Sequence, residues 1–383
     1  MANNNENKIL NVPHLRFPEF TGEWESFKLT ELGKFIGGGT PSSSNLSFWA
    51  GSIPWISSSD IKEDSINNIS ISRYITEEAI EKSTTKYCPA PVILIVSRVG
   101  VGKVALSYTS LCTSQDFCNI IEIKCHPVFL SYNLLRTMKR KSREVQGTSI
   151  KGITSDELQK IRVFIPQDKD EQNKISNILT LLDERIATQN KIIEDLKKLK
   201  SAITDLLFHS IADAHTIRLG EIAHITNGAG DVQDANTEHQ EDWYPFFDRS
   251  EELKWFPTYS FDKEAVIYAG EGQSFYPRYY NGKFALHQRC YAIMDFASCI
   301  IPKYCYHFMN TLNSYFVRNS VGSTVPSLRM DIFQKVEIRL PPIPKQQHIC
   351  KIIDAFYTKL EVEQRGISIL QELKQFLLSQ MFI

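Results

Sequence analysis

The chain has 383 residues, of which 42% are hydrophobic and 23% are charged, as in ordinary soluble globular proteins. This length allows two or three domains, each large enough to bury its own core. The formal net charge of −1 excludes a uniformly basic nucleic-acid-binding protein, but it leaves room for basic surfaces balanced by acidic ones.

Targeting segments, disulfides and metal sites are not indicated by the sequence. It has no signal-peptide hydrophobic segment and no apolar run near the ~18–20 residues that span a bilayer, so we expect a cytoplasmic protein with no membrane partner. The eight cysteines include no CxxC pair, and we expect reduced, mostly buried thiols. The nine histidines form no HxxxH or HExxH spacing, so no metal site is expected.

The first half of the chain has the pattern of a mixed α+β domain. An irregular arm with two prolines, 13–24, precedes an apolar stretch that ends at Gly37-Gly38-Gly39. Short apolar runs then predict strands, and a longer run predicts a helix. The strands are expected at 92–96, 105–108, 120–123 and 163–166, and the helix at 129–140.

Residues 171–208 predict one long helix. They contain neither proline nor glycine, and their apolar side chains recur at steps of three and four or at multiples of that step. Such a helix extends for about 57 Å at 1.5 Å per residue, a length typical of coiled coils. The apolar stripe consists of Ile175, Ile178, Leu182, Ile186, Ile193, Leu196, Ile203 and Leu207.

After residue 208 the sequence repeats itself. The matched segments are 27–38 with 217–228, 147–166 with 322–341, and 172–208 with 346–382. The middles of the two repeats agree only at isolated positions such as Gln115 and Gln288. A period near half the chain predicts two domains, each followed by one long helix. The second stripe consists of Ile349, Ile352, Phe356, Leu360, Ile367, Leu370, Leu377 and Met381.

Two apolar stripes of this length predict that the long helices pair with each other. We therefore expect an α+β fold in which two repeated domains are separated by an antiparallel coiled coil, a dumbbell with a pseudo-two-fold axis. The expected boundaries are 1–168 for the first domain, 169–211 for the first helix, 212–343 for the second domain and 344–383 for the second helix.

Polar residues interrupt both stripes at matched places. One hypothesis is that they fix the register, with Glu363 opposite Lys200 and Gln189 opposite Lys374. The alternative is that all four side chains extend to solvent.

A catalytic motif is not found in the sequence. Residues 98–104 resemble a phosphate-binding loop but lack the GxxxxGK[ST] spacing, and a glycine turn between two strands is the better interpretation. Asp116, Glu122 and Lys124 mimic the carboxylate–lysine pattern of metal-dependent nucleases, but the corresponding segment 289–296 of the second repeat has no counterpart.

Local charge is more informative than net charge. Residues 131–165 carry eight basic and three acidic side chains, a local charge of 8 − 3 = +5. The basic cluster 139–143 is followed at once by a Gly-Thr-Ser turn, an arrangement that suits contacts with DNA phosphates. A solvated helix face is the alternative interpretation.

The second repeat contains Arg, Gln, Asn and His side chains of the kind that read base edges in the major groove. Aromatic residues lie among them, and we expect Phe246, Phe247 and Phe275 to belong to the core. The DNA-binding candidates of both repeats are Ser58, Asp60, Arg98, Lys103, Gln115, Lys139, Arg140, Lys141, Arg143, Thr148, Lys151, Arg249, Arg278, Tyr280, Asn281, His287, Gln288, Arg289, Ser323, Ser327 and Arg329.

Three sequence features together carry a resemblance to a known family. They are Arg16-Phe17-Pro18 with Trp24; Gly38-Gly39-Thr40-Pro41 with Ile53-Pro54-Trp55-Ile56 and Asp60; and a strand–proline–long-helix unit at 161–208 and again at 336–382. With these features the whole chain resembles the specificity subunit of type I restriction-modification systems. The resemblance implies two target-recognition domains, each reading one half of a bipartite sequence in double-stranded DNA, and helices that set the spacing between the halves.

The resemblance also implies partners. The paired helices would dock two methyltransferase (modification) subunits, which restriction and translocase subunits would join. S-adenosylmethionine, ATP and Mg would then be bound in those partners, and this chain would be a non-catalytic subunit without a cofactor. Two other hypotheses are a stand-alone nuclease or methyltransferase with its own target domains, and a coiled-coil adaptor that does not contact DNA.

Overall fold

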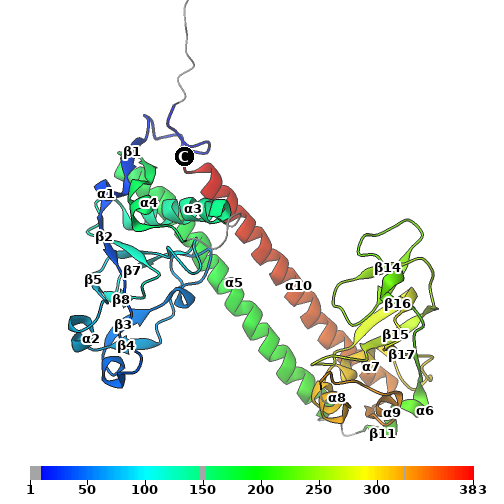
Figure 1. Cartoon of the computed structure of the whole chain (residues 1–383). Helices are drawn as coiled ribbons and strands as arrows, with labels where there is room; N and C mark the ends of the chain where they lie inside the picture. The colour runs from blue at the N-terminus through cyan, green and yellow to red at the C-terminus, as the bar shows by residue number, and fades with distance from the viewer. Residues whose placement is uncertain (1–9, 146–151, 210, 212, 323) are drawn as a thin grey trace, which may run out of the picture. The chain divides into compact units, whose positions relative to one another are not determined.

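Figure 1 shows the chain as a computed structural model, which describes residues 10–145, 152–209, 211, 213–322 and 324–383. The chain divides into two compact units. Unit 1 comprises residues up to 191 together with 365–383, and unit 2 comprises 192–364. Each unit therefore contains one mixed α+β domain and a part of each of two long helices, α5 (Lys169–His209) and α10 (Ile343–Gln380).

The domain of unit 1 is built from short strands. They are β1 (Glu25–Lys28), β2 (Lys34–Gly37), β3 (Ile53–Ile56), β4 (Arg73–Ile75), β5 (Tyr87–Cys88), β6 (Val92–Ile95), β7 (Val104–Ser107), β8 (Leu111–Thr113), β9 (Cys118–Ile121) and β10 (Arg162–Ile165). They form a four-stranded sheet of order β2-β9-β6-β7, a second of order β4-β3-β8-β5, and the pair β1-β10. The strands and helix predicted from the sequence for 92–166 are confirmed.

The helices of this domain are α1 (Leu29–Leu32), α2 (Glu77–Glu81), α3 (Pro127–Val145) and α4 (Ser155–Lys160), with 3₁₀ turns η1 (Leu46–Trp49) and η2 (Ser58–Asp60). The core lies between the sheet, α3 and the long helices. Trp24 packs edge-on against Phe129, with ring centroids 5.6 Å apart, and against Phe382 at 6.4 Å. The arm at 11–24 is therefore part of the core of unit 1.

Unit 2 contains β11 (His215–Arg218), β12 (His224–Asn227), β13 (Tyr244–Phe247), β14 (Lys254–Phe256), β15 (Phe261–Ala269), β16 (Arg278–Leu286), β17 (Cys290–Met294), β18 (Glu337–Leu340), α6 (Leu219–Ile222), η3 (Val232–Asp234), α7 (Pro302–Met309), α8 (Asn313–Asn319) and α9 (Met330–Gln334). One six-stranded sheet has the order β12-β17-β15-β16-β13-β14, and β11 pairs with β18. Phe246 and Phe275 are fully buried and Phe247 nearly so, which confirms their prediction as core residues.

The two domains have the same strand pairing through the middles that differ in sequence. In unit 1, Ile93 is the partner of both Leu106 and Ile120. In unit 2, Val266 is the partner of both Tyr279 and Ile293, and these three positions follow their counterparts at one constant offset in residue number. The repeats therefore agree in backbone structure beyond the ends at which they agree in sequence. Backbone hydrogen bonds build a sheet without regard to side-chain identity, so the frame persists where the sequence does not.

A buried glutamine joins each domain to the helix that follows it. Gln172 accepts a hydrogen bond from the His126 backbone N–H (3.0 Å) and donates one to the Pro166 carbonyl (2.9 Å). Gln346 does the same with the Ile301 N–H (2.9 Å) and the Pro341 carbonyl (2.9 Å). Both side chains satisfy backbone groups that would otherwise be buried without partners.

Within each unit the two long helices run antiparallel. In unit 1, Lys374 reaches Asp183 while Met381 packs in the same core as Ile175. In unit 2, the Lys200 Nζ atom lies 4.1 Å from the ring centroid of Tyr357. The expected register is therefore wrong, because Lys374 is opposite Asp183 instead of Gln189, and Lys200 is opposite Tyr357 instead of Glu363.

These two contacts are equivalent in the repeat. The alignment of 172–208 with 346–382 places Asp183 with Tyr357 and Lys200 with Lys374. Glu363 forms an ion pair with Lys359 on its own helix. In each unit, one lysine on one helix contacts one polar side chain on the other helix. These two contacts, instead of the four residues expected from the sequence, mark the register.

No helix in the described part of the chain is long and apolar enough to cross a membrane. Among those same residues, no group of three or more His, Cys, Asp or Glu side chains is arranged to hold a metal ion. All eight cysteines are free thiols; six are buried, Cys125 is half-buried and Cys299 is exposed. Burial raises the pKa of Cys88 and Cys290 to about 11.

Candidate DNA-reading site

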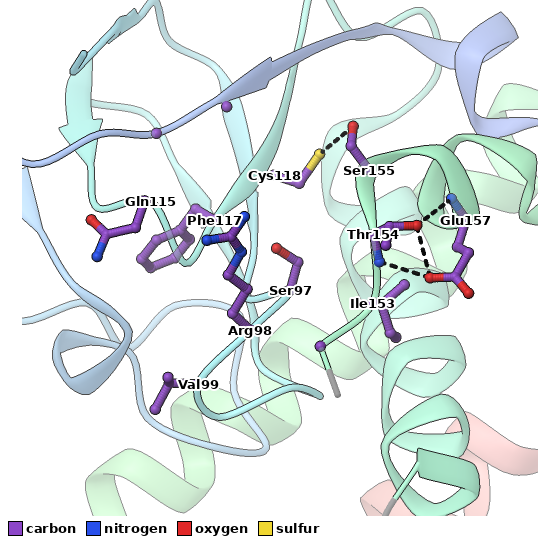
Figure 2. A pocket seen from close by; sticks show the side chains of 13 residues that line it. Ser97, Arg98, Val99, Gln115, Phe117, Cys118, Ile153, Thr154, Ser155 and Glu157 are labelled. Atoms are coloured by element: carbon purple, nitrogen blue, oxygen red, sulfur yellow. Dashed lines mark hydrogen bonds between the residues drawn. The ribbon is translucent and has the colours of Figure 1, made fainter. Parts of the chain in front are cut away.

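A pocket of about 820 Å³ opens in unit 1 where four chain segments meet (Figure 2). The segments are the glycine turn after β2, the end of β6, the turn between β8 and β9, and the residues just before α4. Glycine is required at two of these approaches. A Cβ atom on Gly38 would lie 2.0 Å from the Ser114 carbonyl oxygen, and one on Gly152 would lie 2.6 Å from that of Ser97.

Backbone hydrogen bonds fix this junction. The Ile153 N–H donates to the Ser97 carbonyl (2.7 Å), and the Ser97 N–H donates to the Asp116 carbonyl (2.8 Å). The Thr154 hydroxyl accepts from the Glu157 N–H while the Glu157 carboxylate accepts from Thr154, a capping box that begins α4 beside the pocket. Hydrogen bonds therefore hold several of the segments that form the rim of the pocket.

Two predicted DNA-binding residues of the first repeat, Arg98 and Gln115, line this pocket together. Both side chains are exposed. The Thr40 hydroxyl donates a hydrogen bond to the Gln115 Oε1 atom, which orients the amide. Thr40, Thr154 and Ser155 were not among the predicted site residues, and the Gly-Gly-Thr signal could have indicated the first.

Unit 2 has the same junction. The Leu328 N–H donates to the Gly270 carbonyl (2.7 Å), and the Gly270 N–H donates to the Arg289 carbonyl (2.9 Å). These bonds match those of Ile153, Ser97 and Asp116 one for one. Gln288 therefore occupies the place of Gln115, and Glu271 that of Arg98.

The charges at this junction are exchanged between the units. Unit 1 has Arg98 after β6 and Asp116 after its glutamine, whereas unit 2 has Glu271 after β15 and Arg289 after its glutamine. Arg289 forms an ion pair with Glu271 (2.7 Å). The Asp116 carboxylate instead accepts from the Ser114 hydroxyl (3.1 Å).

The basic cluster of the first repeat lies at the C-terminal end of α3. Arg136, Lys139, Arg140 and Arg143 line a smaller pocket of about 200 Å³ with Gln375 and Ser379 of α10. Lys139 forms an ion pair with Asp64, and burial lowers the pKa of Arg136. A Cβ atom on Gly102 would lie 3.2 Å from the Ser142 side chain, so the loop that carries Arg98 packs against this end of the helix.

The nuclease-like pattern does not form a cluster. Asp116 precedes β9, while Glu122 follows it and pairs with Lys34 at 3.4 Å. The glycine turn predicted between two strands is confirmed, since residues 98–103 connect β6 and β7 and both Gly100 (φ 85°) and Gly102 (φ 112°) need positive φ.

Several other candidates have structural partners. Asp60 pairs with Arg73, whose guanidinium stacks 4.6 Å above the Trp55 ring, and Lys103 donates to the Ser58 carbonyl at 3.2 Å. In unit 2, Arg278 donates to the carbonyls of Asp248 (2.7 Å) and Ser250 (2.5 Å). These side chains therefore help to shape the loops that they contact.

The remaining candidates differ in exposure. Tyr280 packs beside a core cluster, and His287 accepts a hydrogen bond from the Arg289 N–H. Ser327 forms an isolated bridge with Glu271. The residues Arg249, Asn281 and Arg329 are exposed, Lys141 is half-buried, and Thr148, Lys151 and Ser323 lie outside the described residues.

The sixteen residues of the two predicted apolar stripes are all buried or half-buried.

Two copies of one mixed α+β domain, each with a polar junction at its strand ends and each followed by a long helix, define a tandem recognition protein. The profile of the type I restriction modification DNA specificity domain matches residues 21–198 and again 212–375. The chain belongs to this family.

Individual relatives agree with this assignment. The MjaIX specificity subunit of Methanocaldococcus jannaschii is 25% identical over 94% of this chain and 92% of its own length. The EcoR124I/EcoR124II specificity subunit of Escherichia coli is 33% identical over 48% of this chain and 46% of its own length.

Solved structures share the fold. The S subunit of a type I restriction-modification system from M. genitalium superposes with a TM-score of 0.63, at 17% identity, over 97% of this chain and 99% of that one. A chain from a study of complex assembly in the type I system gives 0.61, at 15% identity, over 94% and 97%.

Proposed function

We propose that this chain is the non-catalytic specificity subunit of a type I restriction-modification complex, in which each domain reads one half of a bipartite DNA target. The observation that carries the proposal is the repeated junction, which presents exposed polar and basic side chains from a hydrogen-bonded backbone frame in both units. Base edges are read by such side chains, and a rigid frame lowers the entropy lost on binding.

The long helices are the proposed spacer. The stretch of α5 from Asp183 to Lys200 and the stretch of α10 from Tyr357 to Lys374 are equal in length, and each begins and ends at one of the two interhelical contacts. Each stretch extends for about 26 Å at the helical rise of 1.5 Å per residue. Equal lengths between the two contacts are what a spacer built from two paired helices requires.

The same helices offer surfaces to partner subunits. In unit 1, Leu181 and Ile369 are each 64% exposed and Phe376 is 55% exposed; in unit 2, Leu206 is 63% exposed. Exposed apolar side chains of this size would gain stability from burial against a partner. We propose that two methyltransferase subunits dock there, that restriction subunits join them, and that S-adenosylmethionine, ATP and Mg are bound by these partners.

The test removes one heptad from each helix, residues 187–193 from α5 and 364–370 from α10. This matched deletion keeps the contacts at Asp183 and at Lys200, and a heptad is close to two full turns. The complex with its methyltransferase subunits should methylate a target with a shorter spacer and unchanged half-sequences. Altered half-sequences would contradict the spacer role, and a deletion in α5 alone is the control that should disrupt assembly.

The competing functions give different results with the intact chain. DNA cleavage or methylation by the chain without partners would favour a stand-alone enzyme. Absent or salt-insensitive DNA binding by the assembled complex would favour a structural adaptor, because phosphate contacts make DNA affinity fall steeply with salt.

A further inference from the structure

We propose that Gln115 and Gln288 are equivalent base-reading residues, and that each reads an adenine in the half-target of its own domain. This inference rests on the proposed function, since it names the residues by which the two domains meet DNA. It starts from a comparison of the two units position by position.

The strand-paired stretches 92–121 and 265–294 share a backbone frame and align without gaps. Along them only two positions hold the same residue in both units. One is the position of Ile120 and Ile293. Both side chains are completely buried in the cores, and this burial explains why the position is apolar in both units. The other is Gln115 and Gln288.

Burial does not account for the glutamines, because both side chains are exposed. They lie at the tip of a turn whose flanking residues differ completely between the units: Ser114 and Asp116 in one, His287 and Arg289 in the other. The backbone of the turn is held by neighbouring residues, through the Ser114 N–H to the Ile56 carbonyl (2.9 Å) and the His287 N–H to the Phe247 carbonyl (3.0 Å). A glutamine side chain is therefore not needed to form the turn.

The surroundings of the glutamines indicate a ligand of mixed polarity. Gln115 lines the pocket with Arg98, and Gln288 precedes the exposed Arg289, whose guanidinium forms an ion pair with Glu271. Neutral amides beside arginines suit a polyanion that also offers hydrogen-bonding edges, which describes a DNA groove.

The amide group itself selects the base. A glutamine presents one acceptor and one donor side by side, and adenine presents the matching N6 donor and N7 acceptor in the major groove. In unit 1 the Thr40 hydroxyl already donates to Oε1, which fixes this oxygen and leaves Nε2 on the other side of the amide. Because the carbonyl oxygen has a second lone pair, it can still accept from adenine N6.

The test uses the assembled complex with its methyltransferase subunits and maps the methylated targets. Gln115→Ala should relax one adenine position in the half-target of the first domain, with discrimination there falling about 10- to 100-fold. Gln288→Ala should do the same in the other half-target. In each variant the untouched half-target is the internal control.

Gln115→Glu sharpens the assignment, because a carboxylate retains the acceptor and loses the donor. It should shift preference at the same position from adenine towards cytosine, whose N4 donates a hydrogen bond. Thr40→Val should reduce adenine discrimination less than Gln115→Ala, and Thr40→Ser should restore it.

Unchanged base preference in the Ala and Glu variants would overturn the inference, as would equal loss in both half-targets from a single substitution. These outcomes are separate from failure of the proposed function, which would appear as the absence of any bipartite target in the wild-type complex.

Discussion

Lys374 of α10 forms an ion pair with Asp183 of α5 in unit 1, and their side chains are only 3% and 7% exposed. The Tyr132 hydroxyl donates to the same carboxylate at 2.8 Å, and the Lys374 ammonium lies 5.5 Å from the Tyr132 ring centroid. Burial lowers the pKa of Lys374, and burial together with the Asp183 charge raises the pKa of Tyr132. Both helices and α3 thus meet at one buried charge pair.

Replacement of one member of this pair should be strongly destabilising. Lys374→Met leaves the Asp183 carboxylate buried without its cation, and the free energy of unfolding should fall by about 3–5 kcal/mol. The double variant Lys374→Met, Asp183→Asn should recover most of this loss, because the amide oxygen still accepts from Tyr132. Urea unfolding of the four proteins gives the coupling energy; additive losses would contradict a specific pair.

The equivalent lysine of unit 2 is the matched control. Lys200 lies over Tyr357, is half-buried, and has a cation–π contact in place of a buried carboxylate. Lys200→Met should therefore cost only about 0.5–2 kcal/mol. A loss as large as that of Lys374→Met would indicate that the two contacts are equally important.

The N-terminal arm should detach when Arg16 is replaced. Arg16 makes two hydrogen bonds to Glu171, at 2.7 and 2.8 Å, and the Trp24 indole N–H donates to the same buried carboxylate at 3.2 Å. Arg16→Ala leaves an uncompensated buried charge, so residues 11–24 should become accessible to limited proteolysis. Arg162→Ala, at an exposed arginine that bonds Ser26, is the control.

Stability should fall in mild acid because of His307. Its Nε2 atom lies 3.0 Å from the Asp354 Oδ1 atom, its ring stacks on Tyr357, and burial lowers its pKa below the usual 6.5 in spite of Asp354, with Lys303 and Lys200 adding to the decrease. A lowered pKa means that the unfolded chain binds more protons, so the free energy of unfolding decreases as the pH falls below about 6.5.

The His307→Gln variant removes this titration and keeps a donor for Asp354, so its stability should depend less on pH between about 7 and 5. His348→Gln, at an exposed position of α10, controls for the loss of a histidine. Equal pH dependence in wild type and His307→Gln would contradict the assignment.

The basic end of α3 should contribute to DNA affinity without base preference. If Arg140 and Arg143 each contact one phosphate, the double alanine variant should weaken binding to all sequences and reduce the slope of log K against log salt by about 2. The measurement is DNA binding by the assembled complex at several salt concentrations. Lys82→Ala, at an exposed lysine paired with Glu78, should leave the slope unchanged.

The helices and strands could be predicted because each is indicated by the residue pattern of one continuous stretch of sequence. The long helices follow from uninterrupted 3.6-residue periodicity, and β6 follows from a β-branched run that is buried along its whole length. The helix register could not be predicted, because Asp183 is buried by Tyr132 and Lys374, which come from distant parts of the chain.

The candidate site could be identified only in part from the sequence, because its residues come from segments that lie far apart in the chain. Gln115 and Gln288 are visible in sequence as an isolated agreement, but their equivalence depends on backbone bonds between distant segments. The residue types of Asp60 and Arg278 predict DNA contacts, but in the structure each has a partner within the protein that sequence spacing does not reveal.

The buried amides of Gln172 and Gln346 have a mechanical consequence. Each joins the end of a strand, the start of a domain helix and the first turns of a long helix at one point. Each domain and the first turns of the long helix that follows it should therefore move as one rigid body. Matched insertions or deletions farther along α5 and α10 would then displace a recognition domain without distorting the surface that it presents.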